Sequence, residues 1–302
     1  MNIQASPALT VALPIALVLL LGFWLLFRSR PAERLPAFRS MVLMFLLFML
    51  LTFLHLVLHE GGHSLYAIWQ RVPVTLYVHP FSFAGYSRPI VDASIWEDIL
   101  GTAIAVPVAL LISVPFWKRR SLALLPLVML FPWTAWSNGI NMMTATIGGD
   151  FENLVEKTGL PAAPFVIAGA LIFCLGILSF LSLLPLAGLD PSDRRALFVL
   201  PSAMFLVSML SFLVAHVFVP GSPIDRAYSV GPEILLSANL SVLLYPIVGL
   251  FLAVLYVTLF RKLRPRMPTW LRTGAINLSW KDLRLPGIWW AVSMVIGLIV
   301  VI

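Results

Sequence analysis

Residues 41–69 read MVLMFLLFMLLTFLHLVLHEGGHSLYAIW, a continuous apolar run that carries ionisable side chains only in its second half. A helix of about 20 apolar residues crosses the hydrocarbon core of a bilayer, so this run is long enough to span. Histidine and glutamate are costly at that depth and mark a functional site by default. We therefore predict a membrane helix with a polar site near its end.

The polar site contains the motif His59-Glu60-Gly61-Gly62-His63, which has the form H-E-x-x-H. Residues four apart share one face of a helix, so the two imidazoles can hold one zinc ion from the same side. Glu60 then lies beside the metal, where its carboxylate can take a proton from a water molecule. His55 lies one turn earlier, and three histidines at this spacing extend over about 12 Å, so we expect His55 to pack behind the site. The alternative is a buried polar cluster that only joins helices.

The composition defines the class of protein. The chain is 60% hydrophobic and 11% charged, with a mean hydropathy of +0.98, which predicts an all-α polytopic membrane protein. Its single cysteine, Cys174, excludes an internal disulfide and a cysteine-rich zinc site. The net charge of +7 is typical of cytoplasmic loops beside anionic lipid, so we expect no nucleic-acid partner.

Apolar runs along the chain predict about eight transmembrane helices, at residues 8–27, 41–69, 98–117, 121–145, 161–187, 196–218, 235–260 and 287–302. Pro31 and Pro36 are expected to break the helix between the first two runs. Residues 71–97 contain short β-prone segments around turn residues, which predict a β-hairpin or a re-entrant strand pair after the second helix. An ordinary loop outside the membrane is the alternative.

Basic residues predict the orientation of the chain in a cell membrane. The loops 28–39, 118–120, 188–195 and 261–286 hold 16 of the 20 Lys and Arg residues and lie on one side of an eight-helix topology. The positive-inside rule makes that side cytoplasmic and places both termini outside. The motif and Asp150 then share the extracytoplasmic side. Residues 261–286 are expected to lie on the anionic inner leaflet.

A catalytic zinc ion needs three protein ligands and one open position. We predict Asp150 as the third ligand, because Gly148 and Gly149 before it allow close approach of the backbone. Glu152 is a near alternative and His79 a distant one. Asn138 or Asn141 could donate a hydrogen bond to a substrate carbonyl, or could instead join helices.

These features together resemble the site-2 protease family of intramembrane zinc metallopeptidases, and its compact members most of all. The resemblance covers about residues 41–155 and rests on the motif, on the β-prone stretch that follows it and contains Gly85, and on Asp150, 87 residues after His63. The family pattern usually reads Asp-Gly, whereas this chain has Gly148-Gly149-Asp150.

The resemblance implies that His59, His63 and Asp150 bind one Zn²⁺ ion, that Glu60 is the general base, and that Asn141 contacts the substrate backbone. It implies a metalloendopeptidase that acts on membrane-embedded or membrane-proximal protein or peptide substrates, that is, intramembrane proteolysis. The alternative is a non-catalytic protein that keeps the fold to bind client proteins or metal.

We divide the chain into four parts on this basis. Residues 1–40 hold the first helix and a basic cytoplasmic loop, and residues 41–155 hold the metallopeptidase core. Residues 156–260 hold three further helices, and residues 261–302 hold the basic interfacial segment and the final helix.

Overall fold

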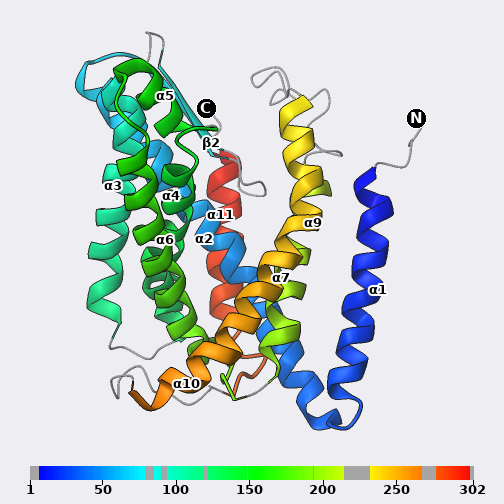
Figure 1. Ribbon diagram of the computed structural model, residues 1–302. Coiled ribbons are helices and arrows are strands. Elements are labelled where there is room, and N and C mark those ends of the chain that lie inside the picture. Colours follow the sequence, from blue (N-terminus) through cyan, green and yellow to red (C-terminus); the bar gives the residue numbers. More distant parts are fainter. Residues whose placement is uncertain are drawn as a thin grey trace. The chain divides into compact units, whose positions relative to one another are not determined.

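The computed structural model describes residues 7–78, 85–89, 94–117, 122–147, 149–192, 194–213, 232–266 and 277–299, and most of these are helical (Figure 1). Six helical segments in this part of the chain are long and apolar enough to cross a membrane: Pro31–Trp69, Ile95–Phe116, Leu122–Met143, Ala163–Ala187, Ala196–Leu213 and Val242–Leu263. Large apolar side chains such as Leu171 stay exposed on them. These features indicate a membrane-embedded helical protein, as the composition predicts.

The helix that carries the motif, α2, extends from Arg34 to Trp69 and is longer than the sequence predicts. Pro36 lies in its first turn, where the missing N–H group would have had no helical partner. The expectation that Pro36 breaks the helix is therefore wrong, whereas Pro31 opens a separate 3₁₀ turn, Pro31–Glu33. Near its other end, the Ser64 hydroxyl donates to the Glu60 carbonyl at 2.9 Å.

Contacts within the chain divide it into two compact units, which share α2. The first unit contains Met1–Met49 and Leu184–Gly287, and the second contains Leu50–Leu183 and Ile288–Ile302.

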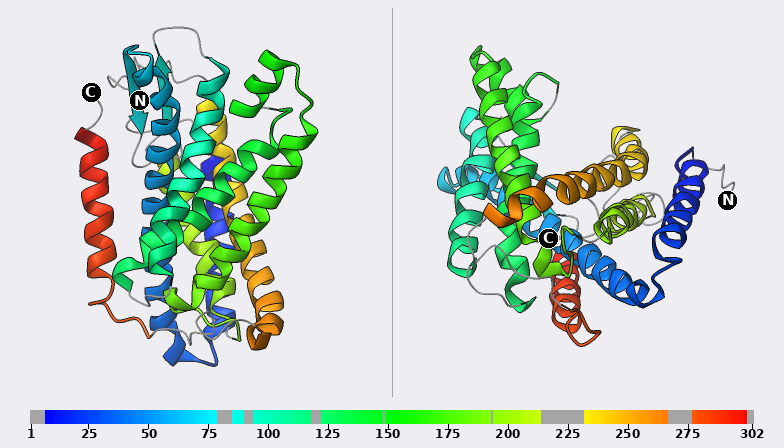
Figure 2. Two further views of the ribbon diagram at one scale, coloured as in Figure 1. Left: turned by 90° about the vertical axis from the view of Figure 1, so that its left-hand side faces the viewer. Right: turned by 60° about the horizontal axis from the view of Figure 1, so that its bottom comes forward.

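The helices of the second unit after α2 are α3 (Ile95–Ser113), α4 (Leu125–Met143), α5 (Asp150–Thr158), α6 (Ala163–Leu183) and most of α11 (Arg284–Ile299). Helices α4 and α6 lie side by side (Figures 1 and 2). Two glycines bring their backbones together: a Cβ at Gly139 would be 2.6 Å from the Phe173 nitrogen, and one at Gly176 would be 2.5 Å from the Trp136 nitrogen. Small residues allow this close packing in membranes.

Helix α3 is anchored at its first turn. Its cap residue, Ser94, accepts a hydrogen bond from the Trp96 N–H group at 3.3 Å, and acidic side chains there match the positive end of the helix dipole. One of them, Asp98, is buried and pairs with Lys157 of α5 at 2.6 Å. This ion pair ties α5, a helix that the sequence did not predict, to α3.

Two short strands follow α2. Strand β1 (Val74–Val78) pairs antiparallel with β2 (Gly85–Pro89), in a register that runs from Val74 opposite Pro89 to Val78 opposite Gly85. Both strands fall within the stretch 71–97 where the sequence predicts strand structure.

The first unit contains α1 (Pro7–Phe27), α7 (Ala196–Leu213) and α9 (Pro232–Leu255), followed by the π-helical turn Tyr256–Phe260 and α10 (Arg261–Leu263). Figure 2 shows α1, α7 and α9 along one another. The Phe198 ring of α7 lies 4.8 Å from Phe23 and 6.1 Å from Phe27 of α1. A Cβ at Gly249 of α9 would be 2.7 Å from the Pro201 Cα atom, so α7 and α9 are closely packed.

Residues 277–283 pack against the first turns of α2. The Arg39 guanidinium donates to the Leu278 carbonyl at 2.9 Å and lies 5.6 Å from the centre of the Trp280 ring. Hydrogen bonds from the Ser279 hydroxyl and backbone N–H hold the pKa of Asp282 below its ordinary value. This end of the basic segment is therefore fixed to the protein by polar contacts.

Candidate metal centre

Three predicted ligands converge at the end of α2. The His59 Nε2 and His63 Nε2 atoms are 3.1 Å apart, and the Asp150 Oδ2 atom is 3.1 Å from the first and 3.4 Å from the second. Both histidines are buried. Ligand atoms of all three residues lie within 4.8 Å of one another, which is close enough to hold one metal ion.

A polar network behind His59 fixes its ring. The Asn138 side-chain N–H donates to the Thr134 carbonyl at 3.0 Å, so the amide oxygen of Asn138 points the other way. That oxygen lies 3.0 Å from His59 Nδ1 and accepts a second hydrogen bond from the Thr102 hydroxyl at 2.7 Å. Because an amide oxygen only accepts, His59 Nδ1 carries the proton. The Nε2 lone pair therefore faces Asp150.

The backbone of α3 holds His63 in the same way. Its Nδ1 atom lies 2.5 Å from the Glu97 carbonyl oxygen, which can only accept, so the proton is again on Nδ1. A Cβ on Gly101 would collide with the His63 ring, and a Cβ on Gly62 would be 2.5 Å from the Leu100 carbonyl oxygen. The two glycines thus let α2 and α3 approach closely enough for this hydrogen bond.

Asp150 is positioned from α4. The Asn141 side-chain N–H donates to Asp150 Oδ2 at 2.6 Å. Gly149 has φ of +92°, a left-handed conformation that glycine adopts without strain, and a Cβ there would be 2.6 Å from the Asn141 oxygen. The sequence prediction of close backbone approach before Asp150 is therefore confirmed at Gly149.

The donor set fits a divalent cation. The Asn141 N–H that donates to Asp150 Oδ2 favours the anionic form of the carboxyl group. Two Nε2 atoms and one carboxylate oxygen then form an electron-rich cluster that needs a positive charge at its centre. Two histidines and one carboxylate are a common catalytic ligand set for zinc. The oxygen partner on each Nδ1 is also the usual arrangement behind metal-bound histidine.

The structure separates the other candidates from this cluster. Glu60 is buried on α2 immediately after His59. The His55 ring is 5.6 Å from the His59 ring and is not part of the ligand group. Glu152 lies in the first turn of α5 but is also not part of that group, and His79 lies outside the described residues.

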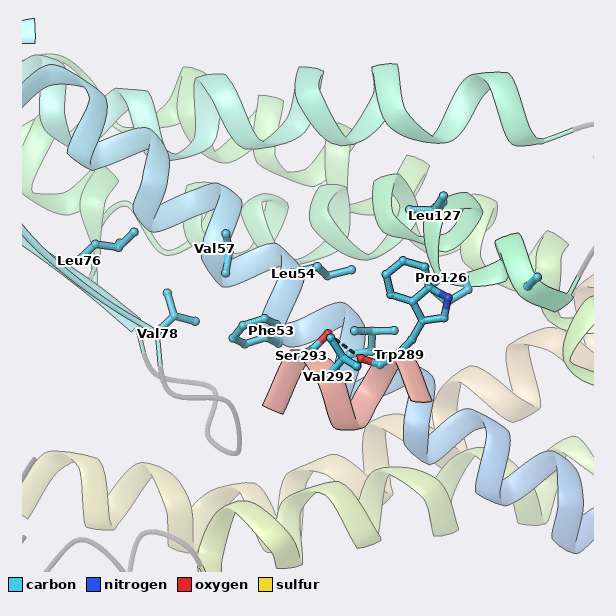
Figure 3. A pocket seen from close by; sticks show the side chains of 12 residues that line it. Phe53, Leu54, Val57, Leu76, Val78, Pro126, Leu127, Trp289, Val292 and Ser293 are labelled. Carbon is cyan, nitrogen blue, oxygen red and sulfur yellow. Dashed lines mark hydrogen bonds between the residues drawn. The ribbon is translucent and has the colours of Figure 1, made fainter. Parts of the chain in front are cut away.

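An apolar cavity of about 380 Å³ lies beside this part of α2 (Figure 3). Helix α2 contributes Leu54 and Val57 to its wall, β1 contributes Leu76 and Val78, and α11 contributes Trp289, Val292 and Ser293. The Ser293 hydroxyl donates to the Trp289 carbonyl at 2.8 Å, so its hydrogen is used within α11. Val57 is three residues before Glu60, which puts the cavity and Glu60 on neighbouring positions of one helix face.

Three supporting groups were not predicted: the Thr102 hydroxyl, the Glu97 carbonyl and the close approach at Gly101. Asn138 was predicted as a donor toward substrate or as a contact between helices, and it is found bonded to His59. A single glycine or a backbone carbonyl leaves no distinct pattern in a sequence.

Asn138→Ala should weaken metal binding about 10–100-fold, the usual effect of removing the partner that orients a metal-binding histidine. The test is the dissociation constant for Zn²⁺, measured by competition with a chromophoric chelator. Asn153→Ala, an exposed change on α5, is the matched control and should bind Zn²⁺ as the wild type does. Equal affinity in both variants would contradict the assigned role of Asn138.

Comparison of the chain with models of known protein families found no match, and comparisons with curated proteins and with solved structures also found none. The convergence of His59, His63 and Asp150 beside Glu60 is the feature from which a function can be inferred.

Proposed function

We propose that the protein is a zinc metalloendopeptidase of the site-2 protease type, which hydrolyses peptide bonds within or beside the membrane. The observation that carries this proposal is the convergence of His59, His63 and Asp150, with Glu60 as the residue after the first ligand. A role in binding metal alone needs the three ligands but no carboxylate beside them. The buried position of Glu60 supports a reaction in which a proton is moved.

Each group of the site has a role in this proposal. His59 Nε2, His63 Nε2 and Asp150 Oδ2 would hold the zinc ion, which supplies Lewis acidity toward water and the scissile carbonyl when bound. The Glu60 carboxylate accepts a proton from the attacking water and delivers it to the departing amine nitrogen. Asn138 and Thr102 keep the proton of His59 on Nδ1. We assign to Asn141 the positioning of Asp150, since its amide N–H already donates there.

We propose that the eight predicted helices all span the membrane. The six apolar segments support this, together with α1 of 21 residues and α11 of 16 residues. The charge distribution supports an orientation with both termini and the metal centre on the extracytoplasmic side and residues 261–286 on the anionic inner leaflet.

The apolar cavity along α2 is the proposed binding site for substrate side chains. A substrate helix must unwind before cleavage, because its carbonyl groups are engaged in its own hydrogen bonds. Apart from Ser293, the residues lining the cavity are apolar, most of them from α2, β1, α4 and α11, so they favour aliphatic and aromatic residues of an opened membrane segment. It lies next to the helix face that carries Glu60, so a chain bound there reaches the site.

Val57→Trp should fill this cavity and lower kcat/KM for an apolar membrane peptide by about tenfold or more, as loss of fit in an apolar pocket does. Cleavage of a short polar peptide and zinc content should both stay at the wild-type level. Ile68→Trp, which adds the same ring at an exposed position of α2, is the control. A loss of activity on both peptides would assign Val57 to folding of the site and not to substrate selection.

The experiment that tests the proposed function combines metal analysis with hydrolysis. The detergent-purified protein should contain about one zinc ion per chain, the stoichiometry of a single three-ligand site. It should cleave a quenched fluorescent membrane peptide, lose cleavage with a chelator and regain it with Zn²⁺. A protein that takes up no zinc would overturn the proposal. A protein that binds zinc and peptide but never cleaves would establish the client-binding alternative.

A further inference from the structure

A second apolar groove lies in the first unit, among α1, α7 and α9. Its volume is about 380 Å³, and its walls are Pro14, Ile15, Val18, Leu19, Gly22 and Leu26 of α1, Leu197, Phe198 and Pro201 of α7, and Leu243, Pro246, Ile247 and Leu250 of α9. From Pro14 to Leu26 a helix rises about 18 Å, at 1.5 Å per residue. The hydrocarbon core of one leaflet is about 15 Å deep, so the groove is about as long as one leaflet.

The walls and the length of the groove indicate its occupant. Every residue that lines it is apolar, and the groove is about as long as one leaflet. These properties match a lipid acyl chain, which is apolar and extends from the head group to the middle of the bilayer.

One end of the groove is basic. Leu26 is two residues before Arg28, and Leu197 is two residues after Arg195 and three after Arg194. The ring pair Phe23 and Phe198, with centroids 4.8 Å apart, places the end of α1 beside the beginning of α7, so these arginines gather at one end. Arg28 and Arg194 are exposed there, and the Arg28 guanidinium lies 5.6 Å from the centre of the Trp24 ring.

We propose that this groove binds one acyl chain of an anionic phospholipid, whose phosphate is held by Arg28 and Arg194. Guanidinium groups match phosphate with paired N–H donors, and basic pockets between membrane helices are suited to anionic head groups. The apolar walls take the acyl chain, and the basic end sets the depth of the head group. The site is in the first unit, whereas the metal centre is in the second, and none of the residues lining the groove belongs to 261–286.

Gly22 gives this proposal a steric test. A Cβ at Gly22 would meet no heavy atom within 4 Å, so a larger side chain there enters the groove without displacing a neighbour. Gly22→Phe should fill the groove, and Gly22→Leu is a smaller version of the same change. Leu21→Phe is the matched control, because Leu21 is exposed and does not line the groove.

The test uses the full-length protein in detergent and measures lipid binding by native mass spectrometry and by the shift in Tm. Phosphatidylglycerol should bind roughly thirtyfold more tightly than phosphatidylcholine with the same chains, the effect of two arginines near a phosphate. The double variant Arg28→Gln with Arg194→Gln should remove this preference, weakening phosphatidylglycerol far more than phosphatidylcholine, whose choline cation offsets the phosphate charge. Gly22→Phe should weaken both lipids, whereas Leu21→Phe and Arg30→Gln should behave as the wild type does.

Three results would overturn the proposal. Equal binding of the two lipids by the wild type would show that the arginines do not recognise the head group. Unchanged binding by both Gly22 variants would show that the acyl chain does not lie in the groove. A Tm shift by glycerol phosphate equal to that of phosphatidylglycerol would show that a free phosphate suffices and that no acyl chain is bound.

Discussion

Glu60→Gln should lower peptide hydrolysis by about 10²–10⁴-fold, the usual contribution of a general acid–base group, and should leave zinc content unchanged. Glutamine has nearly the same shape as glutamate but cannot accept a proton from water. Glu60 is not one of the three converging ligands, so the metal should stay bound in this variant. The measurement is kcat/KM for the quenched membrane peptide, paired with zinc analysis of the same preparation.

The control for this variant is Glu156→Gln, which makes the same chemical change at an exposed position of α5. It should hydrolyse the peptide at the wild-type rate. If Glu60→Gln cleaved as fast as this control, Glu60 would not be the base. If it lost zinc as well as activity, Glu60 would have to be assigned to the metal ligands.

Asp150→Ala should lower zinc affinity by more than about 100-fold, because it removes a ligand, which matters more than removing the partner of a ligand. The two histidines that remain cannot complete a three-ligand site. The protein should therefore lose its zinc on dialysis against a weak chelator, as metal analysis would show. Peptide hydrolysis should disappear with it.

Glu152→Ala is the informative comparison for Asp150→Ala, since the sequence alone leaves Glu152 as an alternative ligand. The structure puts Asp150 Oδ2 within 3.4 Å of both histidine nitrogens, so Glu152→Ala should retain zinc. Loss of zinc in Glu152→Ala together with retention in Asp150→Ala would make Glu152, and not Asp150, the third ligand.

The part of the site that is local in sequence could be predicted. His59 and His63 are four residues apart, and a helix fixes their common face whatever surrounds it. Asp150 could be chosen because glycines precede it, and the left-handed Gly149 supports that reason. The apolar runs likewise identify the helices, since length and hydropathy are properties of each run by itself.

The supporting groups depend on which helices touch, and no single segment encodes that. Asn138 reaches His59 because α4 packs against α2 with this side chain turned toward it. Gly101 faces the His63 ring because α3 also packs against α2, with Gly101 at the contact.

Proline breaks a helix in its interior but not in its first turn, and the sequence does not show that α2 begins at Arg34. Pro36 was therefore predicted to break the helix. Helix α5 has only nine residues, and although Phe151, Leu154 and Val155 lie at helical spacing, a segment this short and polar does not resemble a membrane span.

The long separation between the ligands sets the order of events during biosynthesis. His63 leaves the ribosome 87 residues before Asp150, which at about 5–20 residues per second is a delay of about 4–17 s. During that time the nascent chain offers two imidazoles without the carboxylate, and α4, which carries Asn138, is not yet complete. If the three residues hold zinc as proposed, its capture is therefore a late step that follows insertion of α3 and α4. A chain truncated before Asp150 should then emerge without metal.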